Sequence, residues 1–199
     1  SLLAQQLAFC LALGIPFLGY PTIQSKVLYV QSEISKILFK ERVEAAGRGT
    51  GLIIPPTQLY FSTMFGWHLD KDVAAVDLSK TVGQLKPDVV ILDPKYKLIS
   101  NSGEDAIIHL TDTIDKLIDN YQVTVILIDH ARKPRMAASG SIVDMGGTEL
   151  RGPIIEQWVD SAVRMQGDIG NDNRLLTFEL RHARQLLPPK PVSYTHLTL

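Results

Sequence analysis

The sequence contains little cysteine and has a net charge close to zero. Cys10 is the single cysteine among 199 residues, so the chain cannot form an internal disulfide and lacks the companions that a zinc site needs. A reducing cytoplasm is therefore the simplest location to expect. Lys and Arg number 20 against 21 Asp and Glu, for a net charge of -1. Any contact with nucleic acid would have to come from a local basic patch.

Long uninterrupted hydrophobic runs are also missing. The apolar opening, residues 2–18, is interrupted by Gln5, Gln6, Gly14 and Pro16 and lacks a basic leader. It falls short of the roughly 20 apolar residues that span a bilayer, so we expect neither a membrane span nor a signal peptide. With 45% hydrophobic and 21% charged residues, the composition excludes collagen, coiled coil and general disorder and predicts one globular domain.

Both ends of the sequence look unusual. The chain begins at Ser1 without a methionine, and its first residues already have the spacing of a helix interior, so we expect a missing upstream segment. Residues 192–199 follow the Pro-rich stretch 188–191 and resemble one reading frame of a sequencing adapter. We therefore assign the functional domain to residues 1–191. A natural disordered tail is the alternative for residues 192–199.

Helical and apolar segments alternate along the chain, a pattern typical of an α/β fold with a mostly parallel sheet flanked by helices. The pattern predicts helices near 2–13, 34–46, 72–85 and 104–121, and strands near 27–31, 59–63, 89–93 and 123–129. A last pair, near 159–165 and 174–181, predicts an antiparallel hairpin. Residues 131–153, rich in Gly, Ser and basic side chains, form either a functional loop or a locally disordered one.

Polar residues follow three of the apolar strands. Residues 27–30 lead to Glu33, residues 89–92 end in Asp93, and residues 125–128 end in Asp129 and His130. Ligands bind at the carboxyl ends of parallel strands, so the three together favour a phosphate and metal site. One such aspartate alone would equally be a helix cap or a turn residue.

An Asp after four apolar strand residues has the form of a Walker B motif, whose carboxylate reaches Mg²⁺ through bound water. The companion motif, GxxxxGK[ST], would have to lie just before the first helix. Ser1 could be its last residue, with a hydroxyl that ligates Mg²⁺, while the glycines and lysine would lie upstream. On spacing alone, Ser1 is equally an ordinary helix N-cap.

The segments that begin at Ser1, Val27, Val89 and Val125 resemble the RecA-like ATPase core, and more closely the RepA-type hexameric helicase branch of the AAA family ATPases. The resemblance covers residues 1 to about 191 and implies ATP and Mg²⁺ as cofactors. It implies that Glu33 orients the attacking water, that Asp93 is the Walker B aspartate, and that His130 senses the γ-phosphate. The missing lysine is the main departure from the family pattern.

Each of these residues also has an ordinary explanation. Glu33 could simply open the following helix, where a carboxylate suits the helix dipole. His130 could be a core or loop histidine. Arg132, Lys133 and Arg135 begin the 131–153 stretch and would contact single-stranded DNA or form a solvated basic loop.

The resemblance also places an arginine finger for the neighbouring subunit at Arg181 or Arg184, although either is alternatively a surface arginine. It implies a homo-oligomeric ring that couples ATP hydrolysis to translocation on, unwinding of or loading onto single-stranded DNA in replication. A recombinase-like or clock-like ATPase and a non-catalytic nucleotide-dependent assembly module are the alternatives.

Overall fold

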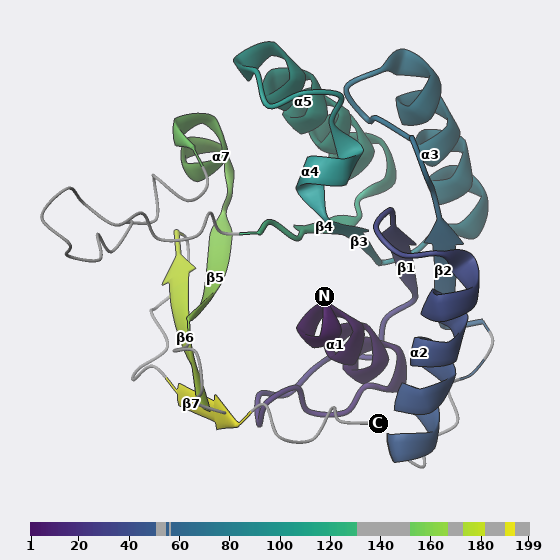
Figure 1. Ribbon diagram of the computed structural model, residues 1–199, viewed down its shortest axis with the longest axis vertical. Helices are drawn as coiled ribbons and strands as arrows, with labels where there is room; N and C mark the ends of the chain where they lie inside the picture. Colours follow the sequence, from purple (N-terminus) through teal and green to yellow (C-terminus); the bar gives the residue numbers. More distant parts are fainter. Residues whose placement is uncertain (51–54, 56, 131–151, 167–172, 182–189, 194–199) are drawn as a thin grey trace, which may run out of the picture. The chain divides into compact units, whose positions relative to one another are not determined.

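The computed structural model describes residues 1–50, 55, 57–130, 152–166, 173–181 and 190–193 (Figure 1). The chain divides into two compact units, residues 1–156 and residues 157–199. Each unit is considered by itself below. Within the described ranges, no helix has both the length and the hydropathy needed to cross a membrane.

The first unit is built on a parallel sheet of four strands. These are β1 (Val27–Gln31), β2 (Leu59–Thr63), β3 (Val89–Asp93) and β4 (Thr124–Leu127), in the order β2-β1-β3-β4. In the register of the central strand, Tyr29 lies opposite Phe61 on β2 and Ile91 on β3. All five residues of β1 and of β3 are buried, which explains why these strands read as continuous apolar runs.

Helices cover both faces of this sheet (Figure 1). One face carries α1 (Leu2–Leu13) and α2 (Lys36–Thr50), and the other carries α3 (Asp72–Leu85), α4 (Lys95–Leu98) and α5 (Glu104–Tyr121). The predicted RecA-like α/β fold is confirmed. Some details differ. Helix α2 begins at Lys36 and continues beyond the predicted end at residue 46, and β4 ends at Leu127 instead of residue 129. The short helix α4 was not predicted because one turn has no measurable periodicity.

Two apolar layers hold these helices against the sheet. On the α1 face, the Tyr29, Phe39 and Phe61 rings pack with centroids 5.2–5.9 Å apart. Ala4 and Ala8, one helical turn apart on α1, are buried in the same cluster. Their small side chains let the helix approach the sheet closely. The other helices bury leucines, isoleucine and valine at helical spacing: Leu78, Val82, Leu110, Ile114 and Leu117.

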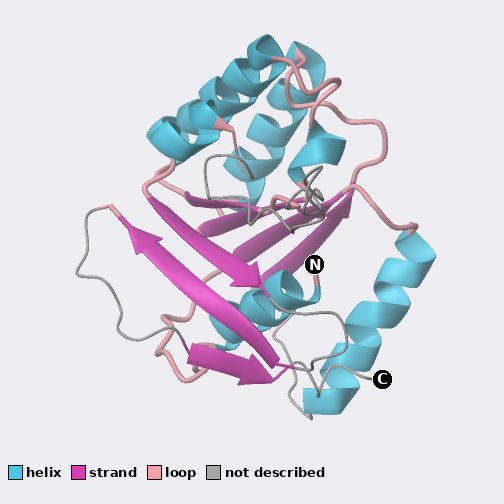
Figure 2. Cartoon of the chain, turned by 60° about the vertical axis from the view of Figure 1, so that its left-hand side comes forward, coloured by secondary structure: helices cyan, strands magenta, loops and turns pink. Residues whose placement is uncertain are grey.

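The second unit contains an antiparallel sheet in the order β5-β6-β7 (Figure 2). Its strands are β5 (Ser161–Gln166), β6 (Asn173–Leu180) and β7 (Lys190–Ser193), and the helix α7 (Pro153–Trp158) precedes β5 in the chain. The β5–β6 pair confirms the predicted C-terminal hairpin. Strand β7 was not predicted, since its Pro-rich sequence argues against a strand.

The expected adapter-derived tail begins within β7. Val192 lies opposite Arg174 and Ser193 lies opposite Asn173 in the pairing of β7 with β6. Residues 194–199 lie outside the described residues. The origin of residues 192–199 therefore stays a prediction.

Candidate functional site

Four of the predicted site residues lie at the carboxyl edge of the parallel sheet. Asp93 is the last residue of β3, Glu33 follows β1 by two residues, and His130 follows β4 by three. Ser1 directly precedes α1 and contacts the same edge through Asp93. The common direction of parallel strands brings these residues together, although they are up to 129 positions apart in the sequence.

Asp93 is the most enclosed of these residues, with 3% of its surface exposed. Its Oδ2 accepts a hydrogen bond from the Tyr29 hydroxyl and another from the backbone nitrogen of Ser1. Burial, followed by the neighbouring Asp93 carboxylate, raises the pKa of the Tyr29 hydroxyl far above its ordinary value. Tyr29 therefore stays protonated and fixes the Asp93 carboxylate as a permanent donor.

The second oxygen of Asp93 is available for a ligand. Asp93 Oδ1 and Ser32 Oγ are buried without a hydrogen-bond partner among the residues that the structure describes, and the Ser32 amide donates to the Asp93 carbonyl at 3.1 Å. Buried polar atoms normally have partners, and carboxylate and hydroxyl oxygens suit Mg²⁺ and its bound waters. These residues fit a hydrated Mg²⁺. In the part of the chain that the structure describes, no three His, Cys, Asp or Glu side chains could enclose a metal alone. The ion would thus retain water or phosphate ligands.

Ser1 caps the first helix of the unit. Its Oγ accepts a long hydrogen bond, 3.5 Å, from the Ala4 amide, which confirms the N-cap interpretation. The amino end of α1 therefore lies beside Asp93, where its free amides and the helix dipole favour an anion. Ligation of Mg²⁺ by the Ser1 hydroxyl stays a prediction.

Glu33 lies in the loop between β1 and α2. Helix α2 begins at Lys36, and Ser35 Oγ accepts from the Leu38 amide at 3.3 Å, so Ser35 and not Glu33 caps that helix. Buried Gln31 holds the loop, because its Oε1 accepts from the amides of Glu33 and Ile34 at 3.2 and 3.1 Å. The Glu33 side chain is exposed and free of a capping role.

A tyrosine that the sequence analysis did not single out joins Glu33 to His130. Tyr96, on α4, donates from its hydroxyl to Glu33 Oε1 at 2.7 Å. Its ring centroid lies 5.4 Å from that of exposed His130, at an interplanar angle of 55°. The hydrogen bond to Glu33, and then burial, raise the pKa of Tyr96 above its ordinary value. A tyrosine three residues after Asp93 was the signal available in the sequence.

The sequence analysis also missed the ion pair between Lys95 and Asp129. Lys95, 8% exposed, pairs through Nζ with Asp129, and its amide donates to the Ile128 carbonyl at 2.7 Å. In the sequence, Asp129 comes directly after four apolar residues, as Asp93 does. In the structure, however, its carboxylate joins the end of β4 to α4, which is a structural contact. Sequence spacing did not distinguish the two aspartates.

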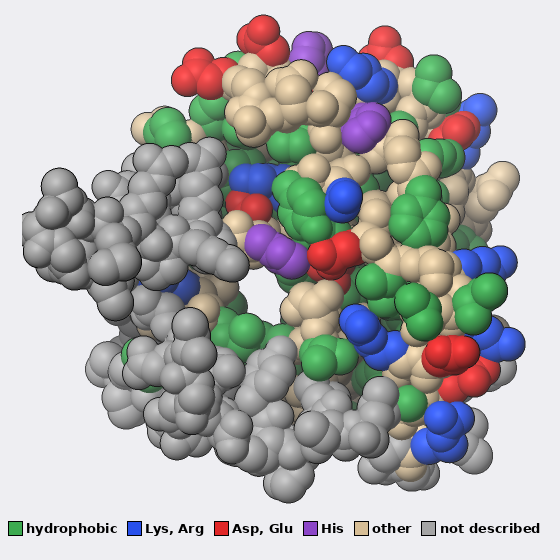
Figure 3. Space-filling view, viewed as in Figure 1, with side chains coloured by type: hydrophobic (Ala, Val, Ile, Leu, Met, Phe, Trp, Pro, Cys, Tyr) green, Lys and Arg blue, Asp and Glu red, His purple; other side chains and the backbone are tan. Residues whose placement is uncertain are grey.

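Among the predicted DNA-contacting and finger residues, the structure describes Arg181 alone. Arg181, after β6, donates to the Gln157 carbonyl at 2.6 Å, and its amide donates to the Asp160 carbonyl at 2.9 Å, all within the second unit. Arg132, Lys133, Arg135 and Arg184 lie outside the described residues. Their roles stay predictions. The face in Figure 3 shows basic and acidic side chains intermixed over the helices, in keeping with the small net charge.

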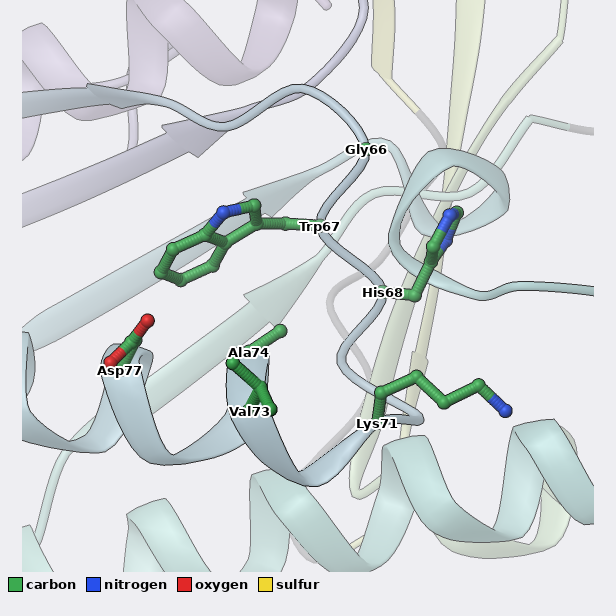
Figure 4. A pocket seen from close by; sticks show the side chains of 7 residues that line it. All are labelled: Gly66, Trp67, His68, Lys71, Val73, Ala74 and Asp77. Atoms are coloured by element: carbon green, nitrogen blue, oxygen red, sulfur yellow. The ribbon is translucent and has the colours of Figure 1, made fainter.

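A shallow pocket of about 250 Å³ lies elsewhere in the first unit, between the loop after β2 and the first turns of α3 (Figure 4). Trp67, His68, Lys71 and Asp77 are among its lining residues. None of the predicted site residues lines it.

Comparison with known proteins identifies the family of the first unit. A family model described as "AAA domain" matches residues 1–136, which include α1, the whole parallel sheet, Asp93, Glu33 and His130. No curated protein matches the chain. The match covers more than half of the chain, and the chain belongs to the AAA domain family of P-loop ATPases.

Proposed function

We propose that this chain is the motor of a ring-forming ATPase of the RepA-type helicase branch, which couples ATP hydrolysis to movement on single-stranded DNA during replication. Family membership supplies the ATPase activity. The observation that carries the proposal is the convergence of Ser1, Glu33, Asp93 and His130 at one edge of the sheet, with Asp93 Oδ1 buried and unpartnered.

Phosphoryl transfer asks a protein mainly to position a water molecule and to neutralise charge on the transferred group. Asp93, oriented by Tyr29, would hold the water shell of Mg²⁺, and the Ser1 hydroxyl would be a direct ligand. When bound, Mg²⁺ supplies positive charge at the phosphates. The amino end of α1 adds a dipole of the same sign at the same place.

Glu33 and His130 have the remaining tasks. An exposed carboxylate on a loop pinned by Gln31 can accept a hydrogen bond from the attacking water and orient it. An exposed imidazole at the end of β4 can donate an N–H to a phosphate oxygen. The two groups lie on either side of Tyr96, which fits one reaction centre.

The phosphate-binding loop is the part of this site that we assign to residues preceding Ser1. A GxxxxGK[ST] turn connects a strand to a helix N-terminus, and Ser1 is the capping residue of such a helix, beside Asp93. The single-stranded DNA partner rests on the resemblance and on the basic residues Arg132, Lys133 and Arg135.

Replacing Glu33 tests the catalytic assignment. In a chain extended by its native upstream sequence, Glu33→Gln should lower ATP turnover at least about 100-fold and leave nucleotide binding nearly intact, since an amide preserves shape but is a poor base. Turnover and binding are measured on the same preparation. Glu44→Gln, at an exposed position on α2, is the matched control and should retain parental turnover. Unchanged turnover in Glu33→Gln would remove Glu33 from the reaction.

A further inference from the structure

The short helix α4 is fixed at both of its ends. At its start, Lys95 is bound to the end of β4 through the Asp129 ion pair and the 2.7 Å bond to the Ile128 carbonyl. At its end, Leu98 is fully buried, and its carbonyl accepts from the Leu69 amide at 2.7 Å. The backbone of Tyr96, between these anchors, is therefore held in place relative to the sheet.

The Tyr96 side chain occupies the space between the two catalytic candidates. Its hydroxyl donates to Glu33 Oε1 at 2.7 Å, and its ring lies against the His130 imidazole. The Lys97 ammonium stands 5.4 Å from the centroid of the same ring, on its own helix. One side chain thus contacts both the loop after β1 and the segment that follows the end of β4.

We propose that Tyr96 is a positioning residue that holds the Glu33 carboxylate and the His130 ring in a fixed mutual arrangement for ATP hydrolysis. This inference rests on the proposed function of Glu33 and His130. Glu33 has a long side chain on an exposed loop, and the Tyr96 hydroxyl restricts its rotation. A carboxylate already aligned for the attacking water loses less conformational entropy in the transition state.

A purely structural role for Tyr96 would predict that its substitution lowers the melting temperature, whereas the positioning role predicts an effect on catalysis. Tyr96 is 43% exposed, so the loss of its side chain removes little buried apolar area. Removing only its hydroxyl should leave the melting temperature unchanged and should not affect the affinity for nucleotide, which Glu33 does not hold. The hydroxyl should matter for kcat alone.

Tyrosine titration tests the contact without any need for catalysis. In the 199-residue chain labelled at tyrosine Cζ, the pKa of Tyr96 followed by NMR should be raised in the parent and should fall toward the ordinary value in Glu33→Gln, because the neighbouring negative charge is removed. The Tyr121 resonance is the internal control, since the Tyr121 hydroxyl pairs with Ser79 at 3.0 Å. An equal pKa of Tyr96 in the parent and in Glu33→Gln would overturn the proposal.

Kinetics test the consequence of that contact. In the extended, active chain, Tyr96→Phe should lower kcat about tenfold with an unchanged KM for ATP. The reason is that the variant loses one hydrogen bond to a charged group. Tyr121→Phe, which also removes one surface tyrosine hydroxyl, should retain the parental kcat. A Tyr96→Phe enzyme with parental kcat, or with a raised KM and a parental kcat, would overturn the positioning role. A parent chain without any ATPase activity would instead overturn the proposed function, and the titration would still decide whether Tyr96 holds Glu33.

Discussion

At the scale of single residues, carboxylates that look alike in the sequence have unlike surroundings. Asp93 has one oxygen held by Tyr29 and Ser1 and the other buried without a partner. Asp129 forms an ion pair with Lys95. Asp70, before α3, has both oxygens bound by Ser100. Among the described residues, Asp93 therefore differs from the other two by a buried carboxylate oxygen that no protein donor contacts.

Asp70 makes stability depend on pH. Burial alone would raise its pKa, but hydrogen bonds from the Ser100 amide at 2.8 Å and hydroxyl at 2.5 Å, together with Lys71 at 3.4 Å, outweigh burial and lower it. A lowered pKa in the folded state adds stability above the unfolded value, about 4, and this contribution is lost as the pH falls through the folded value.

We therefore expect Asp70→Asn to lower the free energy of unfolding by about 1–3 kcal/mol at pH 7, with a difference from the parent that shrinks below about pH 4. Urea unfolding at a series of pH values measures this. Asp112→Asn, at an exposed position on α5, should have little effect at any pH. A constant difference between Asp70→Asn and the parent across the series would contradict the account.

At the scale of elements, the end of α1 depends on a glycine. Gly14 has a φ of 68°, and its amide closes the helix onto the Cys10 and Leu11 carbonyls. A methyl group there would also stand 3.0 Å from Gln24 Cβ. Both the left-handed backbone and the close approach disfavour any other residue.

Gly14→Ala should lower the free energy of unfolding by about 1–2 kcal/mol. Gly47, inside α2, is the matched control, because a methyl group there would meet no atom within 4 Å. Gly47→Ala should raise stability by about 0.5–1 kcal/mol through helix propensity. Chemical denaturation of the two variants decides between them: equal effects would mean that the helix end imposes no special conformation on Gly14.

Much of the fold, and part of the site, could be predicted from the sequence at this scale. Strands β1 and β3 are short apolar runs because both of their faces are buried, and Asp93 ends such a run. Tyr96 escaped prediction because its contacts with Glu33 and His130 join residues 63 and 34 positions away in the sequence. The ion pair of Lys95 was not predicted because a lysine in a four-residue helix is normally expected to be exposed to solvent. Only the three-dimensional arrangement reveals such contacts between α4 and the segments that follow β1 and β4.

At the scale of the whole molecule, the proposed motor must contact single-stranded DNA. If Arg132 and Lys133 contact the phosphates of single-stranded DNA, replacing both by alanine should weaken binding and flatten its salt dependence by about 0.7 counterions per lost contact. Fluorescence anisotropy at several salt concentrations measures both quantities, and the basal ATPase should survive. Binding with parental affinity and salt slope would remove the main support for a DNA-coupled motor.

The assembly of a complete nucleotide site is the central claim, and calorimetric titration with a non-hydrolysable ATP analogue tests it most directly. The chain extended by its native upstream sequence should bind the analogue tightly in the presence of Mg²⁺, and Asp93→Asn in that chain should weaken the Mg²⁺ dependence of binding. Residues 1–199 alone should not bind appreciably, because the proposed function assigns the backbone cradle and lysine for the phosphates to residues preceding Ser1. Removal of residues 192–199 from the extended chain should change nothing. Tight binding by residues 1–199 alone, or an unaltered Mg²⁺ titration in Asp93→Asn, would contradict the account.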